Sequence, residues 1–331
     1  MLRYSSYAQH FKRRYGTRLQ KLSVDAGFSC PNRGEREQGG CTFCRNAAFN
    51  PSYCTPSKSI TQQLEEGIEF HRRRYRHAGR YLAYFQAYSN TYAPLEVLRQ
   101  RYEEALRHPE VEGLVIGTRP DCVDNSKLDY IATLSRRCFV ALEYGVESCY
   151  DATLQRIRRG HDFDCSRRAI EATAARGIHC GIHLILGLPG ESRQAMVDEA
   201  AIISRLPVNS LKLHQLQIIK GTAMEEEARR NPALFPPIGL EAYVGLVCDF
   251  LERLRPDILI ERFAGEVPPR FQAFTERSWR RKDGRLLRNE EIPPLVESEL
   301  ERRGSWQGKH CEEREQAAGE VNQLCIILAD K

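Results

Sequence analysis

The sequence predicts an α/β protein, a partial (β/α)6 barrel of the TIM type with a parallel sheet, followed by an α-rich C-terminal extension. The chain alternates short β-branched or aromatic runs with longer amphipathic stretches, a rhythm typical of right-handed βαβ units. Six such units are more than a small open sheet needs and fewer than the eight of a closed barrel. A length of 331 residues suits one large domain with an appendage.

The expected strands are the short apolar runs at residues 21–26, 81–87, 113–118, 139–145, 180–186 and 210–218. The expected helices are the amphipathic stretches between them, at residues 59–76, 94–107, 126–136, 165–176 and 192–205. Gly177 directly after the fourth helix is a typical C-terminal stop. Beyond the sixth strand we expect a helix at 240–254, a short strand at 257–263 and a helix at 292–303.

These elements suggest four parts of the chain. Residues 1–14 form an N-terminal extension, 15–245 the partial barrel, 246–303 the C-terminal extension, and 304–331 a mobile tail. No apolar run approaches the roughly 18 residues that a membrane span needs, and residues 1–15 lack the apolar core of a secretory signal. We therefore expect a cytoplasmic protein without a membrane partner.

The charge pattern leaves two interpretations open. The net charge is only +5, but cations mix with aromatic residues at 11–15, 71–77 and 279–282. Such stretches suit a phosphate backbone with bases available for stacking. A solvated helix face explains each of them equally well.

The twelve cysteines indicate metal chemistry more than disulfides, because no secretory signal accompanies them. Cys30, Cys41 and Cys44 share the glycine-rich loop after the first strand, and Cys54 lies ten residues further on. Three sites are compatible with these cysteines: a closed four-cysteine zinc site, a fully ligated iron–sulfur cluster, or a four-iron cluster with one open iron. Most of the other cysteines are scattered singly and are typical of plain buried thiols.

The cysteine loop resembles the cluster loop of radical S-adenosylmethionine (SAM) proteins. The resemblance is carried by residues 30–33 and 39–44, Cys-Pro-Asn-Arg and Gly-Gly-Cys-Thr-Phe-Cys. The ten residues between Cys30 and Cys41 depart from the usual Cys-x3-Cys-x2-Cys spacing. A bacterial family related to the radical-SAM subunit of Elongator shares this long gap. Further similarities to that family follow at the ends of the expected strands, at residues 84–94, 117–121, 142–148, 158–161, 183–191 and 212–216.

This resemblance implies the cofactors and the reaction type. Cys30, Cys41 and Cys44 would bind a [4Fe-4S] cluster whose open iron chelates SAM. Reductive cleavage of SAM would then give a 5′-deoxyadenosyl radical that abstracts hydrogen from a substrate. The electron would come from a donor such as flavodoxin or ferredoxin.

The resemblance also suggests residues that contact SAM. Gln86, Ser89 and Asn90 are placed to accept from its amino group, where other superfamily members carry a Gly-Gly-Glu-like turn. Arg159 is the candidate cation for its carboxylate.

The ribose and adenine would lie further along the sheet. Glu143, Glu147 and Ser148 are candidates for the ribose hydroxyls, and strand alternation puts the two glutamates on one face. Either glutamate alone could equally be a structural ion-pair partner. The turn around Gly187 and Leu188 would offer a backbone edge and an apolar wall to the adenine.

The family resemblance points to tRNA as substrate, at the side chain of a wobble uridine. Because the sequence after residue 270 does not resemble an acetyltransferase, acetyl-CoA is not expected. Two alternatives remain: a radical SAM enzyme that acts on a small molecule or peptide, and a non-catalytic, zinc-stabilised RNA-binding protein.

Overall fold

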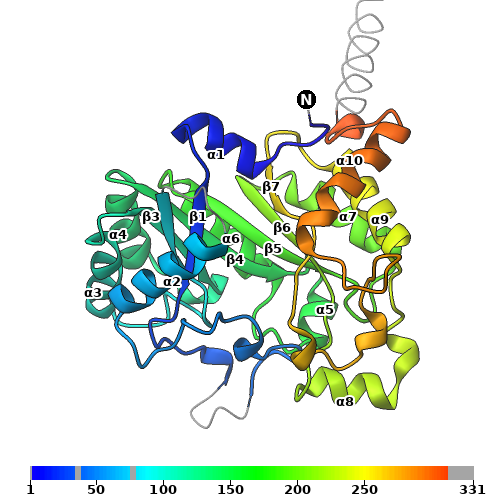
Figure 1. Ribbon diagram of the computed structural model, residues 1–331, viewed down its shortest axis with the longest axis horizontal. Coiled ribbons are helices and arrows are strands. Elements are labelled where there is room, and N and C mark those ends of the chain that lie inside the picture. Colours follow the sequence, from blue (N-terminus) through cyan, green and yellow to red (C-terminus); the bar gives the residue numbers. More distant parts are fainter. Residues whose placement is uncertain (1, 34–38, 75–79, 312–331) are drawn as a thin grey trace, which may run out of the picture.

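Seven parallel strands form one curled sheet in which each strand from the second onward pairs with its predecessor in the chain. The computed structural model describes residues 2–33, 39–74 and 80–311 (Figure 1). The strands are β1 (Leu19–Val24), β2 (Arg80–Phe85), β3 (Val111–Thr118), β4 (Phe139–Glu147), β5 (His179–Leu186), β6 (Ser210–Gln215) and β7 (Leu259–Arg262). This half-barrel confirms the predicted fold class. The short strand expected at 257–263 is β7, and it extends the same sheet beyond residue 245.

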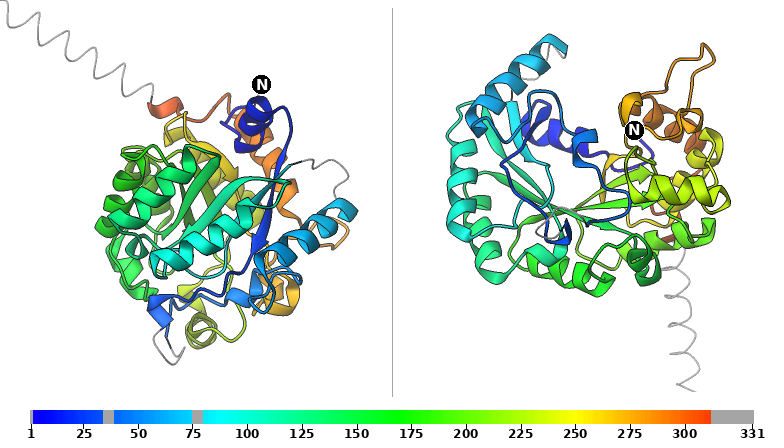
Figure 2. Two further views of the ribbon diagram at one scale, coloured as in Figure 1. Left: turned by 90° about the vertical axis from the view of Figure 1, so that its left-hand side faces the viewer. Right: turned by 90° about the horizontal axis from the view of Figure 1, so that it is seen from below.

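Helices cover the outer side of the sheet, as the arc of coiled ribbons in Figure 2 shows. The helices predicted between the strands are α2 (Ile60–Arg74), α3 (Leu95–Leu106), α4 (Asn125–Ser135), α6 (Phe163–Ala174) and α7 (Arg193–Ile203). Three of them begin at a side chain that accepts from the backbone three residues on: Asp124, Asp162 and Ser192. This capping satisfies amides that have no partner inside the helix.

The C-terminal helices α9 (Leu240–Arg253) and α10 (Ile292–Arg302) also lie where the sequence predicts them. Three further helices were not expected: α1 (Tyr7–Tyr15), α5 (Asp151–Arg156) and α8 (Ala223–Arg230). All three are short, at most nine residues long. No described helix is long and apolar enough to cross a membrane.

The two faces of the sheet differ in chemistry. The outer face packs on the helices in the main apolar core, with Leu22, Leu142 and Leu213 fully buried. The inner face carries charged side chains from β1, β4, β6 and β7 at its middle. Polar groups therefore line the inside of the half-barrel.

The two ends of the described chain meet at β7. The backbone of Ser6 bridges to Ile260, and Ser5 N donates to Gln307 Oε1 at 2.9 Å. Gln307 is buried and also donates to the carbonyl of Ile258 at 2.9 Å. Residues 304–311, which the sequence analysis assigned to a mobile tail, thus pack on the barrel. Residues 312–331 and the 75–77 part of the basic stretch at 71–77 lie outside the described residues.

Candidate active site

The cysteine loop after β1 is anchored on both sides. At its start, Asp25 N donates to Gln63 Oε1 at 2.8 Å and Gln63 Nε2 donates to the carbonyl of Asp25 at 2.9 Å. At its end, Thr42 N donates to the carbonyl of Ile157, and Met224 N donates to the carbonyl of Thr42, both at 2.9 Å. Residues 34–38 of the loop lie outside the described chain.

Cys30, Cys41 and Cys44 line one cavity of about 280 Å³ at the C-terminal ends of the strands. Burial, and then the charges of the Cys41 and Cys30 thiolates, raise the pKa of the Cys44 thiol to about 12. Its outer surface nevertheless stays exposed. Cys54 is buried away from this cavity. The loop thus brings together the three cysteines that the sequence singled out and leaves the fourth aside.

The three cysteines suit a four-iron cluster. Among the described residues, no three Cys, His, Asp or Glu side chains converge closely enough to hold one metal ion. In a four-iron cluster each thiolate binds its own iron, so the sulfur atoms need not converge on one point. A closed zinc site, in contrast, needs four ligands around one centre.

Arg159 connects the cysteine loop to the end of β4. Its Nη1 donates to Cys41 Sγ at 3.4 Å, its Nη2 donates to the carbonyl of Gly145 at 2.5 Å, and Nη2 lies 3.6 Å from Glu147 Oε1. Burial alone would lower the pKa of this guanidinium, but the charges of Cys41 and Glu147 raise it above its ordinary value. A buried cation beside a cysteine sulfur suits an anionic cluster, whose properties depend on such hydrogen bonds.

A glycine makes this approach possible. A Cβ atom on Gly145 would lie 2.5 Å from Glu147 Oε1 and 2.7 Å from Arg159 Nη2. The register of β4 against β5 shifts between Gly145 and Glu147, and Glu147 has a φ of 71°. Positive φ is rare for residues other than glycine. This bulge interrupts the regular strand geometry and directs the Glu147 side chain towards Arg159.

Glu143 is committed to an ion-pair network inside the barrel. Its carboxylate lies 2.6 Å from Lys21 Nζ, 2.5 Å from Lys212 Nζ and 3.2 Å from His183 Nε2. Burial would raise its pKa, but the two ammonium groups hold it well below its usual range. Glu143 and Glu147 both line the cavity, and the bulge after Gly145 places Glu147 there. The ion-pair interpretation of Glu143 therefore has direct geometric support.

Of the three residues predicted to contact the SAM amino group, one lines the cavity and two are buried in the turn after β2. Gln86 lines the cavity and accepts from Ser23 Oγ at 3.0 Å. Ser89 is fully buried and accepts from Arg119 N. Asn90 is also fully buried and donates to the carbonyls of Phe85 and Gly117. Ser89 and Asn90 thus hold the turn after β2, and neither lines the cavity.

The other predicted contacts lie beside the cavity. Ser148 is buried and donates to Glu191 Oε1 at 2.5 Å. Leu188 is buried in a small apolar cluster under the turn. Gly187, at a φ of 94°, lines a second cavity next to the first. None of these three residues lines the cysteine cavity itself.

Other residues of the cavity were not predicted as functional. His183 and His214 lie with ring centroids 5.3 Å apart and both line the cavity. Burial, and then the nearby His183, keep the pKa of His214 well below its ordinary value. Arg262 is the last residue of β7, and Glu266 follows that strand. The sequence contained little indication of their role, because they reach the cavity through the pairing of β7 with β6, which could not be predicted in detail.

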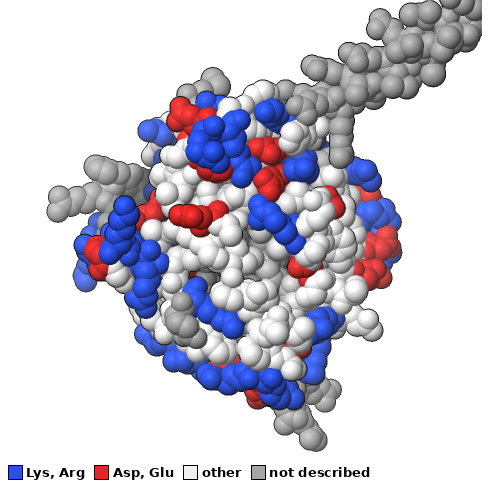
Figure 3. Space-filling view, turned by 90° about the vertical axis from the view of Figure 1, so that its right-hand side faces the viewer, with Lys and Arg blue, Asp and Glu red and all other residues white. Residues whose placement is uncertain are grey.

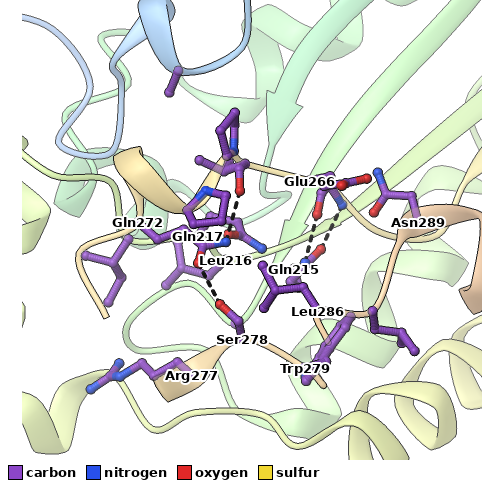
Figure 4. A pocket seen from close by; sticks show the side chains of 18 of the residues that line it. Gln215, Leu216, Gln217, Glu266, Gln272, Arg277, Ser278, Trp279, Leu286 and Asn289 are labelled. Carbon is purple, nitrogen blue, oxygen red and sulfur yellow. Dashed lines mark hydrogen bonds between the residues drawn. The ribbon is translucent and has the colours of Figure 1, made fainter. Parts of the chain in front are cut away.

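A second cavity of about 680 Å³ adjoins the first, and the two share lining residues such as Gln86, Gln215 and Glu266. The side chains labelled in Figure 4 come from the end of β6, the residues directly after it and the chain after β7. The Gln215 side chain is tied to the backbone of Gly265 by two hydrogen bonds, of 2.9 and 2.8 Å. The C-terminal segment therefore forms a wall of the active-site region.

Comparisons with protein families match the chain in two adjacent stretches. Residues 30–201 match the Radical SAM superfamily, and residues 208–291 match the Radical_SAM C-terminal domain. YtqA of Bacillus subtilis is 34% identical over 308 residues, covering 93% of this chain and 92% of that protein. YhcC of Escherichia coli is 38% identical over 260 residues, covering 77% and 81%.

More distant similarity reaches tRNA enzymes. A tRNA uridine(34) acetyltransferase of Methanocaldococcus infernus is 27% identical over 135 residues, which is 40% of this chain and 24% of that protein. The solved structure of the archaeal Elp3 from the same organism superposes with a TM-score of 0.64 at 16% identity. The superposition covers 87% of this chain and 64% of that one, and at this identity it shows a shared fold.

Proposed function

Because this chain belongs to the radical SAM superfamily and thus uses a [4Fe-4S] cluster and SAM, we propose that Cys30, Cys41 and Cys44 bind the cluster. The observation that carries this proposal is their position around one cavity, with the Arg159 guanidinium on the sulfur of Cys41. Gln86 and Glu147 reach the same cavity and are the side chains best placed to contact SAM.

When bound, these cofactors supply a radical able to take hydrogen from an unactivated carbon of the substrate. The chain's own residues place the reactants and surround them. Arg159 holds the end of β4 against the cysteine loop through the carbonyl of Gly145. Ser89 and Asn90 fix the turn that carries Gln86 towards the cavity.

We propose further that the substrate is tRNA and that the reaction alters the side chain of a wobble uridine. Three relatives named as tRNA uridine(34) acetyltransferases support this class of substrate. Charge supports it as well, because Lys and Arg side chains stand around a hollow on the face shown in Figure 3. Such a surface suits a strand dense in phosphates.

The first experiment tests the cluster. We would reconstitute the purified chain with iron and sulfide without oxygen, then measure iron, absorption near 400 nm, and 5′-deoxyadenosine after adding dithionite and SAM. We expect about four irons per chain, lost together with the nucleoside in Cys41→Ala. Cys138→Ala, a half-buried thiol outside the cavity, is the matched control. Tightly bound zinc with no nucleoside would refute the proposal.

The second experiment tests the substrate. The reconstituted enzyme would be incubated with bulk tRNA, and the digested nucleosides would be separated and weighed by mass spectrometry. We expect a mass change confined to a modified wobble uridine and absent from Cys41→Ala. An enzyme that cleaves SAM but changes no nucleoside, in tRNA from several sources, would redirect the search to small molecules and peptides.

A further inference from the structure

The second cavity contains two amide side chains that are free to bind a ligand. Gln217 and Asn289 both line it (Figure 4), and neither side chain makes a hydrogen bond within the described part of the chain. By contrast, Gln272 donates to the carbonyl of Val267 and accepts from Ser278 Oγ. A free amide offers both donors and an acceptor, which match the edge of a nucleobase.

An apolar wall also lines the second cavity, and its tryptophan is held in place. Leu216, Trp279 and Leu286 face the cavity (Figure 4). Trp279 is fixed because its Nε1 donates to the carbonyl of Ile238 at 2.9 Å and its ring packs on Tyr243 at 4.7 Å. A flat ring can therefore pack on this wall while its edge meets the amides, within a volume of about 680 Å³.

Two phenylalanines outside this wall each hold a pair of arginines. Arg45 and Arg270 lie over the Phe271 ring at 5.3 and 5.0 Å from its centroid. Arg229 and Arg277 lie over the Phe274 ring at 5.2 and 4.6 Å. We name this group, Arg45, Arg229, Arg270, Phe271, Phe274 and Arg277, the arginine ridge.

The arginine ridge runs from the cysteine loop to the second cavity. Arg45 directly follows Cys44, and Phe274 and Arg277 line the cavity. Ring faces restrain the guanidinium groups before any ligand arrives, which lowers the ordering cost of binding an anion. The wall shared by both cavities carries the exposed side chains of both Arg262 and Glu266, so the two opposite charges offset each other there.

From this arrangement we infer that the second cavity receives a single nucleobase turned out of an RNA strand, and that the arginine ridge binds the phosphates beside it. The inference rests on the proposed function and deepens it. The cations of the arginine ridge attract the RNA backbone. The base then enters beside the cluster cavity, where Gln217 and Asn289 meet its edge.

The test measures RNA binding by the reconstituted holoenzyme without oxygen, using fluorescence anisotropy. The probes are a synthetic anticodon stem-loop and the same RNA lacking the wobble base. We expect the intact RNA to bind at least about fivefold more tightly, since one packed base contributes that much. In the double variant Gln217→Leu/Asn289→Leu, we expect a smaller difference in affinity between the intact RNA and the RNA that lacks the wobble base.

The ridge is tested by Arg270→Glu. Arg270 is exposed, so the variant should fold, with cluster absorption near 400 nm as the check. We expect weaker binding of both RNAs and a salt dependence reduced by about 0.7 in log–log slope for each lost phosphate contact. The matched control is Arg205→Glu, the same charge change on an exposed residue after α7, at the opposite end of the barrel.

The outcomes separate the two proposals. If the unsubstituted holoenzyme binds neither RNA even at low salt, the proposed RNA substrate fails. If it binds RNA, but Arg270→Glu behaves like Arg205→Glu and the missing base makes no difference, only the cavity and ridge assignment is overturned.

Discussion

The ion-pair network inside the barrel allows a prediction of stability. Lys21, Glu143, Lys212 and Glu261 come from β1, β4, β6 and β7, and their side chains are between 3% and 15% exposed. Two positive and two negative groups are balanced there. Removing one charge from such a buried set costs much more than removing one at the surface, because its partner stays desolvated.

We expect Glu143→Gln to lower the free energy of unfolding by about 3 kcal/mol. Breaking a buried ion pair typically costs 3–5 kcal/mol. Glu261 remains 2.6 Å from Lys21 and 3.2 Å from Lys212, so the lower end applies. The assay is urea unfolding of the reconstituted protein, followed by circular dichroism.

Two further variants make this prediction refutable. Glu69→Gln removes a carboxylate from an exposed pair with Arg73 and should cost less than about 0.5 kcal/mol. Glu143→Leu/Lys212→Met removes one charge of each sign and should recover most of the loss. A Glu143→Gln cost below about 1 kcal/mol, or a double variant no better than the single one, would refute the electrostatic reasoning.

Three other predictions concern strain, pH and capping. Gly145→Ala should lower the rate of SAM cleavage roughly tenfold or more by displacing Arg159, with only about 1–3 kcal/mol lost in urea unfolding; full activity would contradict the packing argument. Burial raises the pKa of Glu199 well above 4.5, so the folded state retains its proton longer and stability falls as pH rises above that value. Glu199→Gln should flatten this decline in unfolding series at several pH values, and an unchanged profile would exclude Glu199 as its source. Asp124→Ala should cost about 1 kcal/mol by removing the cap of α4, measured against Asp129→Ala, an exposed site within the same helix.

The sequence was sufficient where the signal is local. Strand and helix positions follow from periodicity to within a few residues. The caps at Asp124, Asp162 and Ser192, which set where three helices begin, were not predicted. The three cysteines of the cysteine loop lie close together in the sequence, so their grouping could be predicted without knowledge of the fold. Glu143 and Glu147 do line one cavity, but a bulge that alternation does not predict places Glu147 there.

The rest depends on partners distant in the chain. The two lysines that hold Glu143 are 122 and 69 residues away, so its ion pairs could not be derived from β4 alone. Ser89 and Asn90 have residue types that suit a cofactor, but the turn after β2 directs them to backbone groups of the sheet. The second cavity was not predicted, because residues 263–291 form no long helix or strand and line it through contacts with residues distant in the chain, such as Gly265 with Gln215 and Trp279 with Ile238.

The stability network and the cluster site are linked through β4. Glu143 fixes the middle of this strand to Lys21 and Lys212, which holds its position against the rest of the sheet. Two residues further along β4, the carbonyl of Gly145 accepts a hydrogen bond from Arg159, and the same guanidinium donates to the sulfur of Cys41. A displacement of β4 would therefore move the hydrogen bond on the cluster loop, so the charges buried at the centre of the barrel also determine the geometry at its edge.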